Sequence, residues 1–374
     1  REMSPTMTST ITDKKTCWVI KIGSALLTGN GEGLAVDALD HWVEQITKLK
    51  AMDYDIVIVS SGSVAEGMTR LGLQQRPTAL HQLQAAAAIG QAGLIQAYET
   101  RFKKFDLLTA QILLVHDDLS SRTRYLNARQ TLQSLLESNV IPIVNENDTV
   151  ATDEIRFGDN DTLAGQVANL VDADRLLILT DQQGVFTKDP RKHHDATLIQ
   201  ACDVDDKTLD AVASDSSGNL GRGGMSTKIK AARLAARSGT DTVIADGLTN
   251  NVITRLAANE PLGTRLSSAD RPISQRKQWL SGSVASCGQL IIDQGAEKKL
   301  LESGSSLLPI GVTAVNGEFS RGDLVSCVST DGREVARGLT NYTSEEANKI
   351  IGQASDQLSE LLGYGGDKEL IHRD

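Results

Sequence analysis

Short apolar runs alternate along most of this chain with longer segments of helical periodicity, and this alternation constrains the fold more than any other feature. The apolar runs are rich in Val, Ile and Leu, and they occupy residues 17–22, 55–60, 107–115, 140–144, 175–180 and 241–246. The helical patterns occupy residues 35–52, 80–105 (with Gly90 as a candidate break), 121–138, 162–173 and 224–239. Continuous apolar strands separated by helices are typical of a parallel sheet covered on both faces. We therefore expect an α/β protein, a three-layer αβα sandwich around a mainly parallel sheet.

The pattern changes after about residue 265, where a polar stretch without strong periodicity begins. Beyond it, short strands lie between Gly-rich turns, and "STDGRE" has the composition of a hairpin turn. We expect a small β-rich domain there. The predicted division is a disordered leader over 1–15, an α/β domain over 16–266, a linker over 267–282, the β-rich domain over 283–365 and a tail over 366–374.

Charge and composition argue against several classes of protein. A net charge of −10 over 374 residues makes nucleic acid or an anionic membrane a poor partner. No apolar run approaches the roughly 20 residues that span a bilayer, and the first residues lack the apolar segment of a secretory signal. The four cysteines lie far apart in the sequence, which predicts neither a metal site nor a disulfide framework and favours the cytoplasm. The six histidines form no ligand pattern.

Two loops that follow predicted strands carry candidate anion-binding residues. In "KIGSALLTG" the strand ends at Lys21, and Gly23 lets the backbone approach a ligand. In "SSGSVAEG" the Ser and Gly residues, Ser61 among them, precede a helix whose N-terminus favours anions. Each loop also has a purely structural explanation. In the first the lysine extends into solvent, and in the second an ordinary turn ends in a Ser that caps the next helix.

A cluster of short acids and amides follows the apolar run 140–144. Asn145, Asn147 and Asp148 come directly after it, and Asn160 and Asp161 precede the next helical pattern. Turn and cap chemistry accounts for one or two of these residues. Because the whole cluster follows a buried strand at the ligand-binding edge of the sheet, we expect it to hold an ammonium group, orient a lysine or help to place Mg²⁺.

Two further segments are candidates for nucleotide binding. Thr180 and Asp181 end a predicted strand, although turn chemistry explains them equally well. In "GNLGRGGMSTK" (218–228) glycines run into a helix that begins with Ser226, Thr227 and Lys228, as in a phosphate-binding loop. A flexible connector is the alternative explanation for these glycines.

Two lysines on separate loops suggest a mechanism. Phosphoryl transfer needs positive charge on the β- and γ-phosphates, and Lys21 and Lys228 would supply it. If the acceptor is already an anion, no general base is needed, which fits the absence of a His or Cys constellation. An acid between the lysines, such as Asp161, would hold their ammonium groups in position.

These motifs in this order resemble the amino acid kinase family. The resemblance rests on "VIKIGSALLT", "IVIVSSGSVAEG", "NENDTVATDEIRFGDND", "LLILTDQQGVFTKDP" and "GRGGMSTKIKAA". The C-terminal region, with "GSSLLPIGVTAVNGEFSRGDLVS" and "LLGYGG", is similar to the PUA domain of many bacterial members, which implies a small β-barrel-like domain. Residues 17–374 are covered, and the chain looks most like the members that phosphorylate glutamate.

The resemblance implies transfer of the γ-phosphate of ATP to the side-chain carboxylate of L-glutamate, the first step of proline biosynthesis. Lys21 and Lys228 would then stabilise the transferring group, Asp161 would orient them, and Gly23 would contact phosphates. The implied glutamate-binding residues are Ser61, Asp148 and Asn160, with Asp148 facing the α-ammonium. The implied ATP-binding residues are Lys21, Gly23, Thr180, Asp181, Arg222, Gly223, Gly224, Met225, Ser226, Thr227 and Lys228.

The resemblance also implies Mg²⁺ that bridges ATP oxygens without a dedicated protein cage, feedback inhibition by proline and a homodimer or homotetramer. A γ-glutamyl phosphate reductase is a candidate partner. PUA domains usually bind RNA, but residues 281–374 hold 8 Lys and Arg against 14 Asp and Glu, so we expect a regulatory or structural role instead. The competing hypotheses are a kinase for N-acetylglutamate or aspartate and an RNA-binding protein.

Overall fold

The computed structural model describes residues 15–29, 33–115, 118–119, 122–151, 160–215, 224–267, 286–303, 305–321, 323–364 and 366–371. The described residues form two compact units that divide near residue 270, and those between 117 and 128 group with the second unit. The first unit carries every predicted catalytic residue, so it is described first. The predicted leader over 1–15 falls almost wholly outside the described residues.

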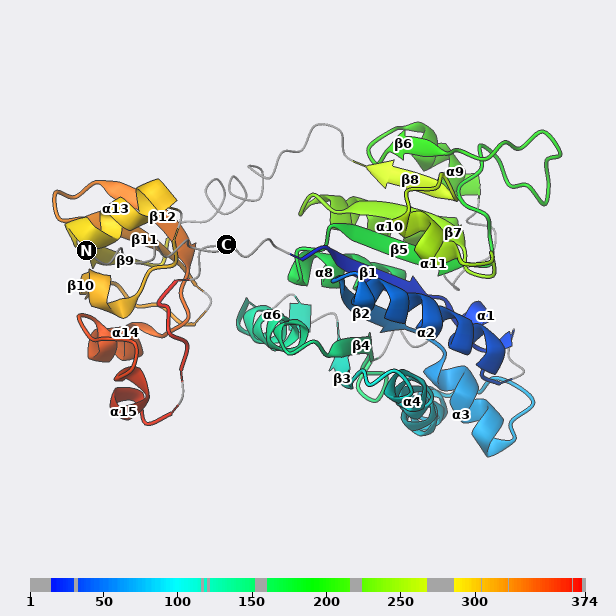
Figure 1. Ribbon diagram of the computed structural model, residues 1–374, viewed down its shortest axis with the longest axis horizontal. Coiled ribbons are helices and arrows are strands. Elements are labelled where there is room, and N and C mark those ends of the chain that lie inside the picture. Colours follow the sequence, from blue (N-terminus) through cyan, green and yellow to red (C-terminus); the bar gives the residue numbers. More distant parts are fainter. Residues whose placement is uncertain are drawn as a thin grey trace, which may run out of the picture. The chain divides into compact units, whose positions relative to one another are not determined.

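The first unit is built on an eight-stranded sheet (Figure 1). Its strands are β1 (Cys17–Ile22), β2 (Asp55–Ser60), β3 (Thr109–Leu114), β4 (Ile141–Glu146), β5 (Arg175–Thr180), β6 (Ala201–Asp203), β7 (Asp241–Asp246) and β8 (Thr264–Ser267). They lie in the order β3-β4-β2-β1-β5-β7-β8-β6, and only the β7–β8 pairing is antiparallel. The predicted α/β class with a mainly parallel sheet is confirmed.

Helices connect the strands and cover both faces of the sheet (Figure 1). They are α1 (Ser24–Leu27), α2 (Val36–Ala51), α3 (Ser63–Leu71), α4 (Leu80–Lys103), α6 (Arg122–Glu137), α8 (Asp161–Leu170), α9 (Thr208–Asp215), α10 (Met225–Ala236) and α11 (Val252–Ala257). The predicted strands and helices all occur, with ends within a few residues of the expected ones. The short strands β6 and β8 were not predicted, because neither contains a long apolar run.

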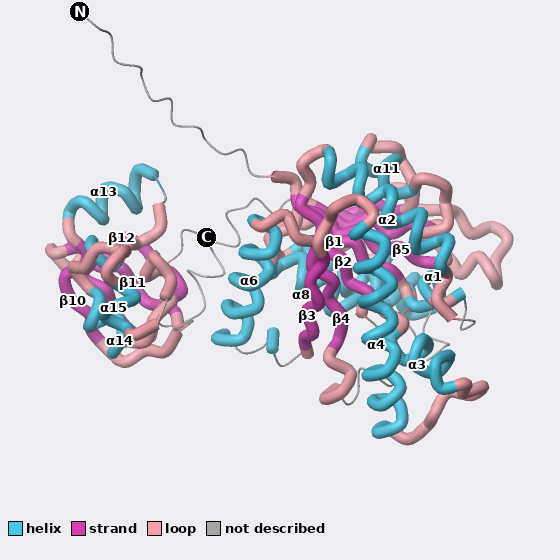
Figure 2. Tube along the Cα trace, turned by 60° about the horizontal axis from the view of Figure 1, so that its bottom comes forward, coloured by secondary structure: helices cyan, strands magenta, loops and turns pink. Residues whose placement is uncertain are grey.

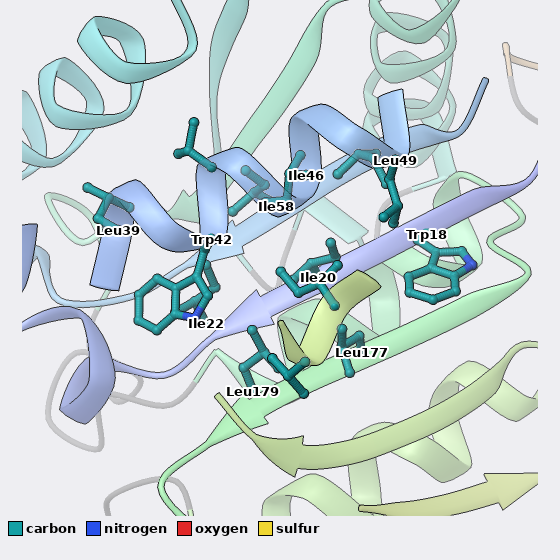
Figure 3. Close-up of a cluster of buried hydrophobic side chains, with 14 of the residues drawn as sticks. Trp18, Ile20, Ile22, Leu39, Trp42, Ile46, Leu49, Ile58, Leu177 and Leu179 are labelled. Carbon is teal, nitrogen blue, oxygen red and sulfur yellow. The ribbon is translucent and has the colours of Figure 1, made fainter. Parts of the chain in front are cut away.

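The side-chain alternation of β1 assigns each of its residues to one face of the sheet. Trp18, Ile20 and Ile22 point to the α2 side, where they join Leu39, Trp42 and other residues of one buried apolar cluster (Figure 3). Lys21, between Ile20 and Ile22, therefore points to the opposite face. That face is covered by α8, which packs against β1, β5 and α10. A lysine buried near the carboxyl end of an apolar strand is thereby aimed at the N-termini of two helices.

Gly90 does not break α4, so that expectation was wrong. The helix is continuous, and α3 lies directly beside it (Figures 1 and 2). A Cβ atom on Gly90 would come within 1.7 Å of the Ser63 carbonyl oxygen, and one on Gly67 would come equally close to the Ala86 carbonyl oxygen. Glycine is needed here because the two backbones touch. The contact anchors the first turn of α3, which follows Ser61.

The second unit contains a four-stranded sheet in the order β10-β9-β11-β12. Its elements are β9 (Gly288–Ile292), α13 (Gln294–Ser303), β10 (Val312–Asn316), β11 (Leu324–Ser329), β12 (Glu334–Leu339), α14 (Ser344–Ile350) and α15 (Leu358–Leu362). Strands β11 and β12 form the predicted hairpin, with its turn at Gly332. A separate apolar cluster that includes Leu290, Val325 and Tyr342 fills the interior. Across the described parts of both units, no helix has the length and apolar character needed to cross a membrane.

Candidate active site

Polar residues stand at the carboxyl ends of four neighbouring parallel strands. In the order β4-β2-β1-β5, these residues are Asn145 in β4, Ser61 directly after β2, Lys21 in β1 and Thr180 in β5. In open parallel sheets, ligands bind outside this edge. The sheet therefore brings together residues that lie up to 159 positions apart in the sequence.

Asp161, the first residue of α8, is the centre of a buried charge cluster. Its Oδ1 atom lies 2.5 Å from Lys21 Nζ, and its Oδ2 atom lies 3.1 Å from Lys228 Nζ. Asp161 is 0% exposed, Lys21 4% and Lys228 5%. Two buried ammonium groups thus share one carboxylate, and their positive charges make the cluster a good place for a phosphate.

The lysines keep the Asp161 carboxylate ionised. Burial alone would raise the pKa of this carboxyl group. The charges of Lys21 and Lys228, with hydrogen bonds from Lys21 and Thr227, outweigh burial and hold the pKa well below its usual range. Asp161 is consequently a permanent anchor for the two ammonium groups and is not suited to act as a general acid or base near neutral pH.

The N-terminus of α10 lies against this cluster. Gly224 is the N-cap of the helix, Met225 is buried, and Ser226 and Thr227 are half-buried in the first turn. Thr227 Oγ1 lies 2.7 Å from both Asp161 Oδ2 and the Gly224 carbonyl oxygen. The positive end of the helix dipole therefore adds to the charge of the lysines. Arg222 and Gly223 lie outside the described residues.

The remaining predicted ATP-binding residues lie at the ends of β1 and β5. Thr180 is buried, and its hydroxyl group donates to Asp181 Oδ1 at 3.1 Å. The Gly23 amide donates to the Leu179 carbonyl oxygen at 3.3 Å, so the loop after β1 is tied to β5. The position of these residues at the ligand-binding edge agrees with a nucleotide site, and their ATP-binding roles stay predictions.

A second group of polar residues lies after β2 and β4. Ser63 Oγ donates to Asp148 Oδ2 at 2.7 Å, which joins the start of α3 to the loop after β4. Burial raises the pKa of the Asp148 carboxyl group, while the hydrogen bond from Ser63 and the charge of Arg76 act in the other direction. Ser61 Oγ is buried and has no hydrogen-bond partner among the described residues. Residues 152–159 lie outside the described part of the chain.

Asn160 connects this second group to the charge cluster, because it directly precedes Asp161 in the chain. Its Nδ2 atom donates to the Ser60 carbonyl oxygen at 2.5 Å and to Asn145 Oδ1 at 2.7 Å. Asn145 Nδ2 in turn donates to Gln91 Oε1 at 2.7 Å. The three side-chain amides form a buried row, which we call the amide relay.

The structure brings together most of the residues predicted from the sequence, Asn145 among them, and adds Gln91. The predicted strand end at residue 144 was too early, since β4 continues through Asn145 and Glu146. Gln91 was not predicted at all. One signal was present in the sequence: Gln91 is a polar residue on the same helical stripe as Ala87, Leu94 and Tyr98, which are buried.

Comparison with known proteins agrees with this architecture. The sequence model of the amino acid kinase family matches residues 16–246, and the model of the PUA domain matches residues 288–362. The chain belongs to the amino acid kinase family. The domain limits predicted above differ somewhat from these ranges and stay predictions.

Within that family, the chain is similar to proteins named "Glutamate 5-kinase". It is 58% identical to the one from Pseudomonas fluorescens (strain Pf0-1), over 96% of both chains. It is 57% identical to that of Thioalkalivibrio sulfidiphilus, over 96% of this chain and 95% of the relative. It is 56% identical to that of Hydrogenovibrio crunogenus, over 98% of this chain and 97% of the relative. The resemblance seen in the sequence motifs is confirmed.

Proposed function

We propose that this protein transfers the γ-phosphate of ATP to the side-chain carboxylate of L-glutamate and so forms γ-glutamyl phosphate, the first step of proline biosynthesis. The observation that carries the proposal is the buried Lys21–Asp161–Lys228 cluster, which is joined through the Asn160–Asp161 peptide bond to the amide relay. The lysine cluster suits a phosphate, and the amide relay suits a small polar acceptor. The similarity to glutamate 5-kinases over nearly the full chain supports glutamate as that acceptor.

The chemistry follows from the charges. A carboxylate oxygen of glutamate forms a bond to the γ-phosphorus, the bond from that phosphorus to the β–γ bridging oxygen breaks, and ADP leaves with the bonding electron pair. The nucleophile is already an anion, so no side chain has to remove a proton. Lys21 and Lys228 stabilise the charge on the transferring group and on the leaving oxygen. Asp161 holds both ammonium groups in place, and Ser61, Asp148 and Asn160 bind glutamate.

An ATP-dependent kinase of this kind works with a divalent metal, which we propose is Mg²⁺. Both carboxylate oxygens of Asp161 already face lysine ammonium groups, so they are not available to a metal. The residues present therefore fit a metal that is held mainly by the phosphates of ATP. No group of three or more His, Cys, Asp or Glu residues in the described segments could hold a metal ion alone. The metal would neutralise phosphate charge, and the residues named above would bind and orient both substrates.

Other features remain part of the proposal. We include feedback inhibition by proline, assembly as a homodimer or homotetramer, a cytoplasmic location and delivery of the product to a γ-glutamyl phosphate reductase. For the C-terminal domain we propose a regulatory or structural role, because its acidic charge disfavours RNA. Tight, salt-sensitive retention of RNA in a filter-binding assay at low salt would contradict that role.

Trapping of the product with hydroxylamine tests the proposed reaction. Glutamate with Mg·ATP and hydroxylamine should give γ-glutamyl hydroxamate, because hydroxylamine attacks the acyl phosphate. Aspartate and N-acetylglutamate are the comparison acceptors, and each should react far more slowly. Phosphorylation of one of these acceptors, without hydroxamate from glutamate, would overturn the proposal.

Asp148 should control the pH dependence of glutamate binding. Its carboxylate attracts the α-ammonium only when ionised, and burial raises its pKa. As the pH falls, KM for glutamate should therefore begin to rise at a higher pH than for an ordinary aspartate, whose pKa is about 3.9. Asp148→Asn should raise KM about 10- to 100-fold, since hydrogen bonds to charged groups contribute about 1.5–3 kcal/mol, and should leave kcat nearly unchanged.

The measurement is KM for glutamate against pH in both proteins. Titration of the glutamate side chain affects both profiles, so the difference between them isolates Asp148. Parallel profiles would show that Asp148 does not bind the ammonium group.

A further inference from the structure

The amide relay has a fixed polarity, because backbone groups anchor it. The Ser60 carbonyl oxygen can only accept a hydrogen bond, so the Asn160 atom that faces it is Nδ2. The Glu146 backbone amide can only donate, and it donates to Asn145 Oδ1 at 2.8 Å. Asn145 Nδ2 must then face Gln91, which presents Oε1. Each amide orientation follows from its neighbours, with no freedom to rotate by half a turn.

This polarity decides what Asn160 can offer a substrate. Both hydrogens of its Nδ2 atom are used, one by Ser60 and one by Asn145. Within the described part of the chain, no hydrogen bond involves Asn160 Oδ1, so the side chain presents an acceptor. An acceptor suits a donor such as the α-ammonium group of an amino acid and repels a carboxylate.

Gln91 ends the relay, and its environment is unusual. It is 9% exposed, and its Nε2 atom is buried without a hydrogen-bond partner among the described residues. A buried unsatisfied donor is unfavourable, so packing alone does not account for a glutamine here. What the side chain supplies is Oε1, which satisfies the Asn145 amide group.

We propose that Gln91 is a positioning residue that makes this site selective for a free α-ammonium group on the acceptor. It acts through Asn145, whose orientation fixes Asn160 with its oxygen toward the substrate. Without the Gln91 acceptor, Asn145 would bury an unsatisfied NH₂ group, and its side chain would gain from turning away toward another acceptor. Asn160 would then lose one of the two hydrogen bonds that hold its oxygen toward the substrate. The inference rests on the proposed function and adds a basis for selection between free and N-blocked acceptors.

The test compares glutamate with glutarate, which has both carboxylates but no ammonium group. Gln91→Met keeps the side-chain length and removes the acceptor. KM for glutamate should rise about 10-fold with kcat within about 2-fold, while Ki for glutarate as a competitive inhibitor should change less than about 2-fold. Gln91→Glu retains an oxygen toward Asn145, so it should restore KM to within about 3-fold of the wild type.

Gln45→Met is the matched control. Gln45 is a buried glutamine on α2 whose Oε1 atom accepts from the Ile253 amide at 2.8 Å, and its loss should not change the glutamate-to-glutarate ratio. Equal weakening of glutamate and glutarate by Gln91→Met, or equal effects of Gln91→Met and Gln45→Met, would overturn the role of Gln91. If Gln91→Met fails to fold, the test uses Gln91→Glu instead. A change in the ratio of KM for glutamate to Ki for glutarate in that variant contradicts the inference. Failure of the wild type to form the hydroxamate would instead overturn the proposed function.

Discussion

Lys228→Ala should lower kcat by about 10³-fold, because the variant loses a preorganised positive charge at the transferring phosphoryl group. KM for glutamate should stay within about 3-fold, since the lysine contacts Asp161 and not the residues assigned to glutamate. Steady-state kinetics with each substrate varied separately separates the two effects. Asp148→Asn should instead act on KM. Different effects of the two substitutions would distinguish the proposed phosphate-binding part of the site from the proposed glutamate-binding part.

Lys230→Ala is the control for the loss of a lysine from α10. Lys230 lies two residues further along the helix and is exposed, so its removal should leave kcat within about 2-fold. A similar loss of kcat in both variants would mean that helix stability, and not the Lys228 ammonium group, limits the reaction. A large rise in KM for glutamate in Lys228→Ala would contradict the assigned role.

Asp161→Asn should have the second large effect, this time on stability as well as activity. The substitution leaves two buried ammonium groups without the carboxylate that they share. Removal of one partner from a buried ion pair typically costs about 3–5 kcal/mol. The free energy of unfolding, measured in urea, should fall by an amount of this order. The kcat value should fall at least about 10²-fold, because neither lysine is held in place.

A second substitution separates charge from packing. In Asp161→Asn/Lys228→Met, one of the two ammonium groups that shared the Asp161 carboxylate is replaced by an apolar chain of similar length. This double variant should be more stable than Asp161→Asn alone, although it should remain inactive. If removal of Lys228 instead destabilises Asp161→Asn further, the cluster is held by packing, and the electrostatic account fails. The prediction applies near neutral pH, where the low pKa of Asp161 keeps the wild-type carboxylate ionised.

Much of the fold could be predicted because its strands are buried on both faces. The runs at 55–60, 175–180 and 241–246 coincide with β2, β5 and β7. The error at Gly90 has a physical reason: the sequence shows that a glycine is present, but only the packing of α3 on α4 shows which backbone it touches. The short strands β6 and β8 depend on pairing with each other and with β7, which local composition does not reveal.

The charged half of the candidate site was easier to predict than the amide half. Lysines and a Gly-rich loop at strand ends indicate phosphate chemistry by themselves. Asn145 and Gln91 do not, because amides are common turn and surface residues. Their part in the site comes from hydrogen bonds between α4, β4 and the residue before α8, which lie more than 50 residues apart or across a loop. Local patterns cannot indicate such contacts.

Asn160 and Asp161 give the site one last property. The residue that would hold the acceptor and the residue that holds the two lysines proposed to bind phosphate are consecutive, so their Cα atoms are about 3.8 Å apart. In-line attack requires the reacting atoms to approach within about 3–3.5 Å. Thermal motion of the surrounding helices would move both residues jointly, so the two bound substrates would shift in the same direction and stay close to each other. The covalent bond between the two residues would thereby limit changes in the distance between the reacting atoms. Such changes are larger in sites whose residues come from separate elements.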